Sequence, residues 1–177
     1  MEAYEINIKN STEIDNNTYD PELLASYSAK ILSDNINENE RKEKDIVNVK
    51  IESKNKNYEY KYSLNEIKVI GKHLTTSNDF FLKFKSKEYD KMYDDFIDKN
   101  IITKEAFNGF INETVLKNEK IFGEINAIEL NGFNISTVNN MDIIEIISSS
   151  KLPKGTLRFS TRFLKNGNGK IAGFYVN

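Results

Sequence analysis

The sequence predicts an α+β fold: a single compact domain over residues 1–177, with a mainly antiparallel sheet built from hairpins and three to four helices packed on it. Three observations lead to this class. Some stretches alternate apolar and polar residues, as strands do, and others repeat apolar residues every three or four positions, as helices do. The chain is also long enough for one proper core, because a domain of this size buries roughly 70% of the surface that its unfolded chain exposes.

The first expected elements are a strand and a helix. Tyr4, Ile6 and Ile8 alternate with polar residues and predict a short strand. Asp20-Pro21-Glu22 predicts a helix start, because Asp caps free N–H groups and Pro fits the first helical position. The apolar residues of this helix fall on one face, namely Leu23, Leu24, Tyr27, Ile31 and Leu32. Residues 35–45 are polar and charged, and we expect a flexible loop there.

A hairpin with one apolar and aromatic face should follow. Its strands flank a turn at residues 53–57 and carry alternating large side chains: Val47, Val49, Ile51, Tyr58, Tyr60 and Tyr62. Residues 63–74 leave two alternatives, because Ser63 and Glu66 fit a capping box that opens a helix, while the strand could also continue. Residues 75–79 are predicted to form a turn and residues 80–85 a strand.

Two amphipathic helices are expected in the middle of the chain. The first begins at Ser86, and its buried face consists of Tyr89, Met92, Tyr93, Phe96 and Ile97. The second begins at Thr103, and its buried face consists of Phe107, Phe110, Ile111 and Thr114 or Val115.

The last third of the chain reads mainly as β-structure. Residues 125–136 predict a hairpin that turns at Asn131-Gly132, since both positions tolerate the positive φ of a type I′ turn. Residues 141–148 form either a short apolar helix or a buried strand. A final basic hairpin, residues 155–177, is expected to turn at residues 166–169.

Charge is distributed unevenly along the chain. The sequence has 25 basic and 27 acidic residues, but residues 146–177 contain six basic residues and no Asp or Glu. The tail is therefore formally +6 and the remainder −8, which gives the net charge of −2. Clustered positive charge without carboxylates attracts phosphates or an acidic partner surface. Asn, Lys and Ile make up 68 of the 177 residues and have A/T-rich codons, so the missing acids are more informative than the many lysines.

The final hairpin supplies the candidate binding residues. Strand alternation places Leu157, Phe159, Thr161 and Phe163 on one face and Arg158, Ser160 and Arg162 on the other. The two guanidinium groups are then roughly 13 to 14 Å apart along the strand, a spacing that suits successive phosphates. Further cations flank the strands: Lys151, Lys154, Lys165 and Lys170. The alternative is that this basic face neutralises acidic helices of the same molecule.

An acidic helix stripe is the alternative binding surface. Asp90, Asp94 and Asp98 recur every four residues, and Tyr89 and Tyr93 lie beside them. Such a stripe suits a basic partner, as in an inhibitor or immunity protein, with tyrosine as the anchor. The other interpretation is the solvated side of an amphipathic helix.

No catalytic, metal or cofactor site is predicted. The absence of cysteine excludes disulfides, thiolate metal sites and a cysteine nucleophile. His73 is the single histidine, which excludes a two-histidine metal site, and a structural role is favoured for it. Gly167-Asn168-Gly169-Lys170 fails the phosphate-binding loop pattern, because Leu164 and Ile171 stand where that pattern needs Gly and Ser or Thr. The Tyr58, Tyr60 and Tyr62 row could stack bases, but packing is favoured.

These observations predict a non-catalytic binding protein. We expect a cytoplasmic protein with no membrane contact, because no segment approaches 18 consecutive apolar residues. A small cysteine-free chain from A/T-rich DNA suits a phage or mobile-element protein that inhibits a host defence nuclease, as an anti-CRISPR does, through nucleic acid or nucleoprotein contacts. The protein–protein inhibitor ranks second and a carboxylate-based enzyme last. The final strand could also pair with a second copy, which would give a homodimer.

Overall fold

The computed structural model describes residues 3–37, 44–97 and 102–177, and the α+β class is confirmed. Two sheets are present, with strand orders β1-β2-β3 and β4-β5-β6-β7. In chain order the elements are β1 (Ala3–Lys9), α1 (Thr12–Asp15), α2 (Pro21–Asn35), β2 (Ile46–Glu52), β3 (Asn57–Ser63), α3 (Leu64–Lys85), α4 (Tyr89–Tyr93), α5 (Lys104–Phe110), the π-helix η2 (Ile111–Leu116), α6 (Lys117–Phe122), β4 (Glu129–Val138), β5 (Met141–Leu152), β6 (Gly155–Leu164) and β7 (Ile171–Val176).

The chain divides into two compact units. One comprises Met1–Gly71 with Asn131–Asn134, and the other comprises Lys72–Leu130 with Ile135–Asn177. Helix α3 and strand β4 therefore contribute residues to both units, and a single domain over 1–177 stays a prediction. In the described ranges, no helix combines the length and the apolar character of a membrane span. Most of the predicted loop 35–45, residues 38–43, lies outside the described residues.

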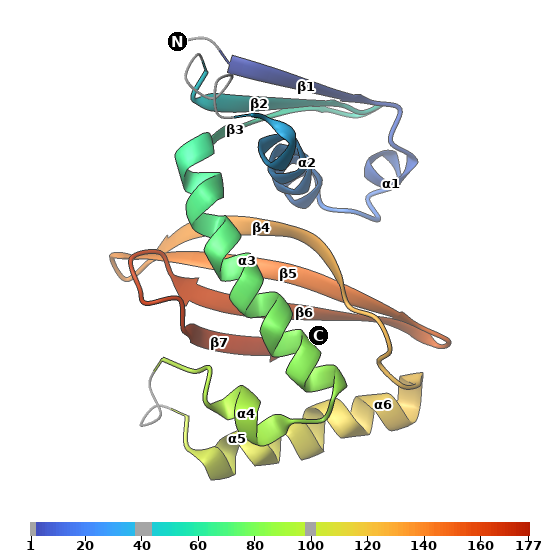
Figure 1. The fold of residues 1–177 in the computed structure, drawn as a ribbon. Helices are drawn as coiled ribbons and strands as arrows, with labels where there is room; N and C mark the ends of the chain where they lie inside the picture. The colour runs from blue at the N-terminus through green and yellow to red at the C-terminus, as the bar shows by residue number, and fades with distance from the viewer. Residues whose placement is uncertain (1–2, 38–43, 98–101) are drawn as a thin grey trace. The chain divides into compact units, whose positions relative to one another are not determined.

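The first unit contains the three-stranded sheet, with α2 against one face (Figure 1). Strand β1 pairs with β2 in parallel, and β2 pairs with β3 antiparallel. The expected hairpin is confirmed, because three fully buried residues of β2 stand opposite three tyrosines of β3, in the pairs Val47 with Tyr62, Val49 with Tyr60 and Ile51 with Tyr58. The tyrosines thus belong to the side that α2 covers, which favours packing over base stacking.

Helix α2 begins as predicted but buries a different face. Asp20 Oδ1 accepts a hydrogen bond from the N–H of Glu22 at 2.9 Å, and Pro21 is the first helical residue. Tyr27 and Ile31, expected in the core, are exposed. Small residues are buried instead: Ala25, Ser26, Ala29 and Ser33. The reason is a close backbone approach, because Ser26 Oγ accepts a hydrogen bond from the buried N–H of Phe133 at 2.9 Å.

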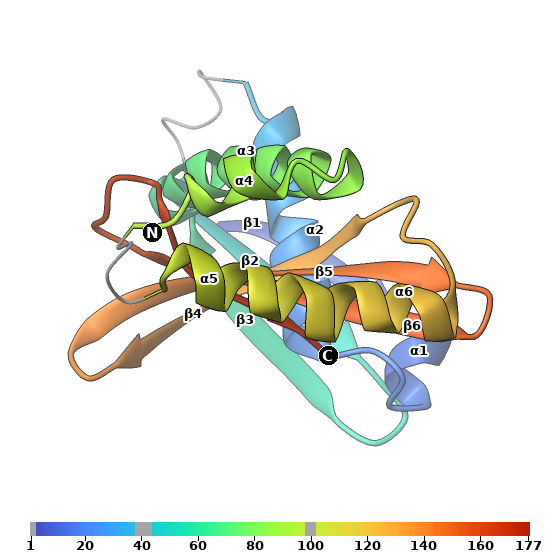
Figure 2. The same cartoon turned by 90° about the horizontal axis from the view of Figure 1, so that it is seen from below.

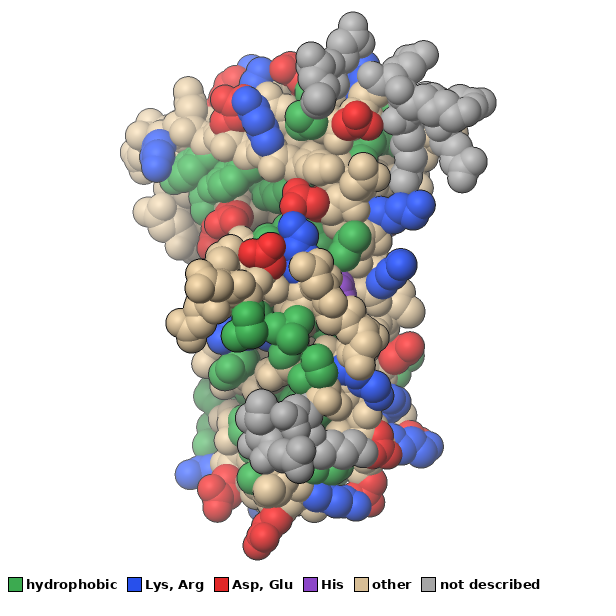
Figure 3. All heavy atoms as spheres, turned by 90° about the vertical axis from the view of Figure 1, so that its left-hand side faces the viewer, with side chains coloured by type: hydrophobic (Ala, Val, Ile, Leu, Met, Phe, Trp, Pro, Cys, Tyr) green, Lys and Arg blue, Asp and Glu red, His purple; other side chains and the backbone are tan. Residues whose placement is uncertain are grey.

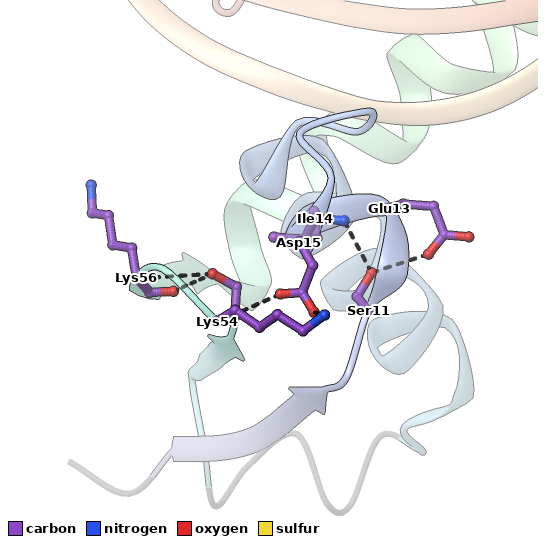
Figure 4. Close-up of polar contacts among 7 residues, drawn as sticks. Ser11, Glu13, Ile14, Asp15, Lys54 and Lys56 are labelled. Atoms are coloured by element: carbon purple, nitrogen blue, oxygen red, sulfur yellow. Dashed lines mark hydrogen bonds and ion pairs between the residues drawn. The ribbon is translucent and has the colours of Figure 1, made fainter.

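Helix α1 is fastened to the β2–β3 turn by polar contacts (Figure 4). Ser11 caps this helix by accepting a hydrogen bond from the N–H of Ile14. Asp15 Oδ1 accepts a hydrogen bond from the backbone N–H of Lys54 at 2.8 Å. The turn itself is closed by Ser53, whose hydroxyl donates to the carbonyl of Lys56 at 2.7 Å. These contacts join two segments that lie 39 residues apart in the sequence.

Helix α3 settles the alternatives for residues 63–74 in favour of the helix. It runs unbroken over 22 residues, so the turn predicted at 75–79 and the strand predicted at 80–85 are wrong. The polar run that suggested a turn is amphipathic at helical spacing: Ser77 is buried in line with Leu74 and Phe81, while Thr75 faces solvent. Burial of that one stripe, rather than local polarity, decides the conformation.

The middle helices differ from the prediction in length. The helix expected from Ser86 is short, because α4 spans only Tyr89–Tyr93. The helix start at Thr103 is confirmed, since its hydroxyl accepts a hydrogen bond from the N–H of Ala106 at 3.2 Å. Helices α5, η2 and α6 then follow one another as one continuous rod (Figure 2). Phe107, Ile111 and Val115 are buried along it, as predicted.

In the second sheet, one predicted turn is wrong and the predicted last hairpin is confirmed. Asn131-Gly132 is not a turn, because β4 runs through both residues. The chain instead turns at Asn139 and Asn140, whose φ angles are +50° and +63°, as a type I′ turn requires. Residues 141–148 belong to strand β5, and β6 pairs antiparallel with both β5 and β7.

One face of this second sheet forms a core with α3, which crosses it in Figure 1. The inward residues of β6 are buried as the alternation predicted: Leu157, Phe159, Thr161 and Phe163. Aromatic rings pack edge to face between β6 and α3. The ring centroid of Phe159 is 5.6 Å from that of Phe81 and 6.0 Å from that of Phe84. The opposite side of the strands carries the candidate site.

Candidate functional site: the outer face of the C-terminal sheet

The residues that alternate with this core define an outer face on β5, β6 and β7. Ile144 and Ile146 are buried in β5, so their odd-numbered neighbours point the other way. Besides the half-buried Ile143 and Ile147, this side carries Glu145, Ser149, Lys151, Arg158, Ser160, Arg162, Gly173 and Tyr175, and we call these eight residues the outer face. It contains three of the six predicted cations.

Arg162 is held by a neighbouring strand. Glu145 stands opposite it in the β5–β6 register, and the Arg162 Nε to Glu145 Oε1 distance is 2.9 Å. The hydroxyl of Ser160 donates to the same carboxylate oxygen. Burial alone lowers the pKa of Arg162, but Glu145 and Tyr175 outweigh it and leave that pKa raised. Arg162 is therefore neutralised within the sheet, by a strand rather than by the acidic helices that the alternative interpretation invoked.

Arg158 has a different environment on the same strand. It stands opposite Ser149, and its backbone pairs with Asn177 in both directions. Its side chain is exposed, and within residues 3–37, 44–97 and 102–177 no side chain bonds its guanidinium. Lys151 stands opposite Thr156, which makes it a diagonal neighbour of Arg158, about 7–8 Å away between Cα atoms. Lys154 is exposed in the adjoining β5–β6 turn.

Three cations thus gather without partners in the described part of the chain. We call this group the open cationic end: Lys151, Lys154 and Arg158. Of the other predicted lysines, Lys170 is engaged through its side chain, because its Nζ donates to the carbonyl of Asp94 at 2.8 Å. Lys165 contributes its backbone N–H, which donates to the carbonyl of Asp142 at 2.9 Å. On the side drawn in Figure 3, by contrast, acidic and basic side chains are interspersed.

Of the predicted acidic stripe, the structure describes Asp90 and Asp94. Because α4 ends at Tyr93, Asp94 follows as its C-cap and Asp98 lies outside the described residues. Asp90 Oδ1 is 2.7 Å from Lys104 Nζ. Tyr93 packs on Phe107, with ring centroids 6.0 Å apart, and Tyr89 packs on Phe84 at 6.3 Å. The helix predicted from Ser86 is therefore shorter than expected, because the chain leaves helical conformation after Tyr93 and bridges Ile171 of β7 through Phe96.

That bridge also bears on the expected homodimer. Strand β7 is the edge of its sheet, but residues 95–97 cover its start. The carbonyl of Ile171 accepts a hydrogen bond from the N–H of Ile97, and the N–H of Ile171 donates one to the carbonyl of Asp95, both at 2.9 Å. From Gly173 to Val176 no described strand pairs on the outer side. Pairing with a second copy stays a prediction for this shorter edge.

The cavities of the second unit offer little for catalysis. A cleft of about 340 Å³ beside α3 is mainly apolar and is lined by Phe81, Leu82, Ile125, Ile128 and Ser148 among others. A cavity of about 270 Å³ contains Asp79 and Asp95, but Asp95 is 2.5 Å from Lys83. Among the described residues, no group of three His, Cys, Asp or Glu side chains is arranged to hold a metal ion. We assign no catalytic residue.

Sequence reasoning predicted that Arg158 is exposed, as it is, but missed the positions of Glu145 and Tyr175. Both are single positions in strands whose register depends on where the hairpins turn. A β-bulge between Arg162 and Phe163 further shifts β7 against β6. Strand alternation within β7 points the side chains of Phe174 and Tyr175 to opposite faces of the sheet, and this was the only local signal that Tyr175 faces outward.

Comparison of the chain with family models, with curated proteins and with solved structures gave no match in any of the three.

Proposed function

We propose that this protein is a non-catalytic binding protein that engages a nucleic acid or a nucleoprotein through its open cationic end. One observation carries the proposal: Lys151, Lys154 and Arg158 lie together and lack partners among the described residues, in the first half of a 32-residue stretch without Asp or Glu. Such a group recruits phosphates, because each contact releases counterions from the polynucleotide.

The biological setting that we propose is a phage or mobile-element inhibitor of a host defence nuclease, comparable to an anti-CRISPR. Chain size, the absence of cysteine and the A/T-rich composition support that setting. A surface made of exposed lysine and arginine suits a nuclease partner that presents its own nucleic acid. The acidic inhibitor remains the second candidate: Asp90 lies in α4 and Asp94 is its C-cap, but Asp90 is paired with Lys104 at 2.7 Å.

Salt dependence tests the proposal directly. Replacing Lys151→Gln and Arg158→Gln together should weaken binding of a labelled oligonucleotide and reduce the slope of log affinity against log salt by about 1–2. Fluorescence anisotropy over a range of KCl concentrations measures both quantities. The matched control is Lys117→Gln with Lys120→Gln, which removes two exposed charges from α6.

The control should leave the salt slope at the wild-type value. Equal slopes for all three proteins, or no oligonucleotide binding by the wild type, would contradict the proposal. Capture of a host nucleoprotein with and without nuclease treatment then separates the two partner classes, since a direct nucleic-acid contact is lost on digestion.

A further inference from the structure

Tyr175 is a large aromatic side chain on the outer face, in the edge strand β7. It stands opposite Ser160, and 44% of its surface is exposed. Exposed aromatic residues on a sheet face are the usual stacking platforms for unpaired bases, because every base offers a π face.

A glycine makes room for the ring. Gly173 lies two residues earlier on the same side of β7, and a Cβ atom built there would be 3.1 Å from Cε2 and 3.3 Å from the hydroxyl of Tyr175. The ring therefore leans over Gly173, against the sheet. A larger residue at 173 would push it away from this position.

Arg162 holds the ring from the neighbouring strand. Its guanidinium carbon is 4.4 Å from the ring centroid, within the range of a cation–π contact. Glu145 fixes that guanidinium through the 2.9 Å ion pair. The row Glu145, Arg162 and Tyr175 thus runs across β5, β6 and β7, and it arranges two planar groups before any ligand arrives, which reduces the entropy lost on binding.

The open cationic end lies further along the same face. Arg158 is four residues from Arg162, which corresponds to roughly 13–14 Å along the strand. A polynucleotide strand that crosses the face would meet planar side chains at one end and unpaired cations at the other. A duplex can use the cations but not the ring, because its bases are already stacked and paired.

We infer that the outer face binds single-stranded nucleic acid in preference to duplex, with a base stacked on Tyr175 and the phosphates near Arg158 and Lys151. This inference rests on the proposed function and names the ligand class of that same site. The shared chemistry is an unpaired base followed by a phosphate, so both RNA and DNA strands qualify.

The chain offers a clean optical test, because it contains no tryptophan. The variant Tyr175→Trp places a single indole on the platform. Titration with oligo(dT) and, separately, with oligo(U) should quench its emission, whereas a duplex of equal length should not. Quenching by both single strands means that the site accepts RNA and DNA alike. Quenching by only one of them means that the site is specific for that polymer. Equal quenching by duplex, or none by any strand that binds, overturns the inference.

Affinity variants provide the second test. Tyr175→Leu should weaken binding of single strands by about 5- to 100-fold and leave duplex affinity unchanged. Tyr175→Phe should keep most of the affinity, because the stacking surface survives. The matched control is Tyr27→Leu, which removes another exposed tyrosine, on α2.

The two proposals fail in different ways. If Tyr175→Leu binds single strands like the wild type while Lys151→Gln with Arg158→Gln still weakens binding, the stacking inference is wrong and the proposed function stands. If the wild type binds neither strands nor duplex, both are wrong. Circular dichroism of each variant confirms that a lost affinity is not a lost fold.

Discussion

At the scale of single residues, Gly132 shows how a tertiary contact overrides a local signal. It lies inside β4 with φ of +158°, and a Cβ atom there would be 2.5 Å from the carbonyl oxygen of Leu23 and 2.6 Å from Ser26 Oγ. Tyr19 supports the same segment by donating from its hydroxyl to the carbonyl of Asn131 at 2.7 Å. The glycine is therefore required by close contact with α2 and not by a turn.

This contact predicts that Gly132→Ala destabilises the fold by about 1–3 kcal/mol, since backbone atoms must move apart. The matched control is Gly109→Ala in α5, where nothing lies within 4 Å of an added Cβ. That change should stabilise the protein by about 0.5–1 kcal/mol, because alanine favours helix. Urea unfolding followed by circular dichroism measures both free energies. Equal midpoints for Gly132→Ala and wild type would contradict the proposed contact.

At the scale of elements, local chemistry predicted starts and alternation but not lengths. The α2 start at Asp20, the α5 start at Thr103 and the facing pairs of β2 and β3 depend on nearby residues, and all are confirmed. Helix α3 was missed after Leu74, because its polar residues 75–79 resemble a turn until the distant strand β6 buries Ser77. In the site, alternation predicted the exposed Arg158, whereas the ion pair of Arg162 required the β5–β6 register, which no local pattern specifies.

The packing of α3 on β6 includes one buried polar pair. The hydroxyls of Ser77 and Thr161 are 2.8 Å apart, and both residues are fully or almost fully buried. Ser77→Ala and Thr161→Val should each destabilise the protein by about 1–3 kcal/mol, because each leaves the other hydroxyl without a partner. The double variant should lose less stability than the two single variants lose together, with a coupling free energy of about 0.5–1.5 kcal/mol.

Urea unfolding of the four proteins in the cycle measures that coupling. Thr76→Ala serves as the control in the same helix, since its hydroxyl only donates to the carbonyl of Lys72 at an exposed position. It should change stability by less than about 0.5 kcal/mol. Strict additivity of Ser77→Ala and Thr161→Val would show that the two hydroxyls do not interact in solution.

At the scale of the whole molecule, formal charge overstates the surface that is free to bind. The acid-free stretch 146–177 carries six cations, yet Glu145, one residue before it, neutralises Arg162, and a backbone carbonyl engages Lys170. The count of charges along the chain predicted a broad cationic region, and pairing across strands leaves the open cationic end as the part of it without partners among the described residues.

Stability of the whole molecule should depend on pH through its single histidine. His73 is 4% exposed, its ring lies 4.8 Å from that of Phe163, and its Nδ1 has no hydrogen-bond partner among the described residues. Burial and the adjacent Lys72 lower its pKa. The unfolded chain therefore takes up a proton near pH 6.5, where the folded chain still resists one. Above that pH the histidine costs no stability, and below it stability falls until the lowered pKa is reached.

The variant His73→Phe removes this titration while keeping an aromatic ring beside Phe163. Urea midpoints measured at about pH 8 and about pH 5 should therefore fall more steeply for the wild type than for the variant. Surface carboxylates titrate in both proteins, so the difference between the two slopes reports His73 alone. Parallel pH profiles would mean that the imidazole is protonated equally in the folded and unfolded chain, and they would contradict the lowered pKa of His73.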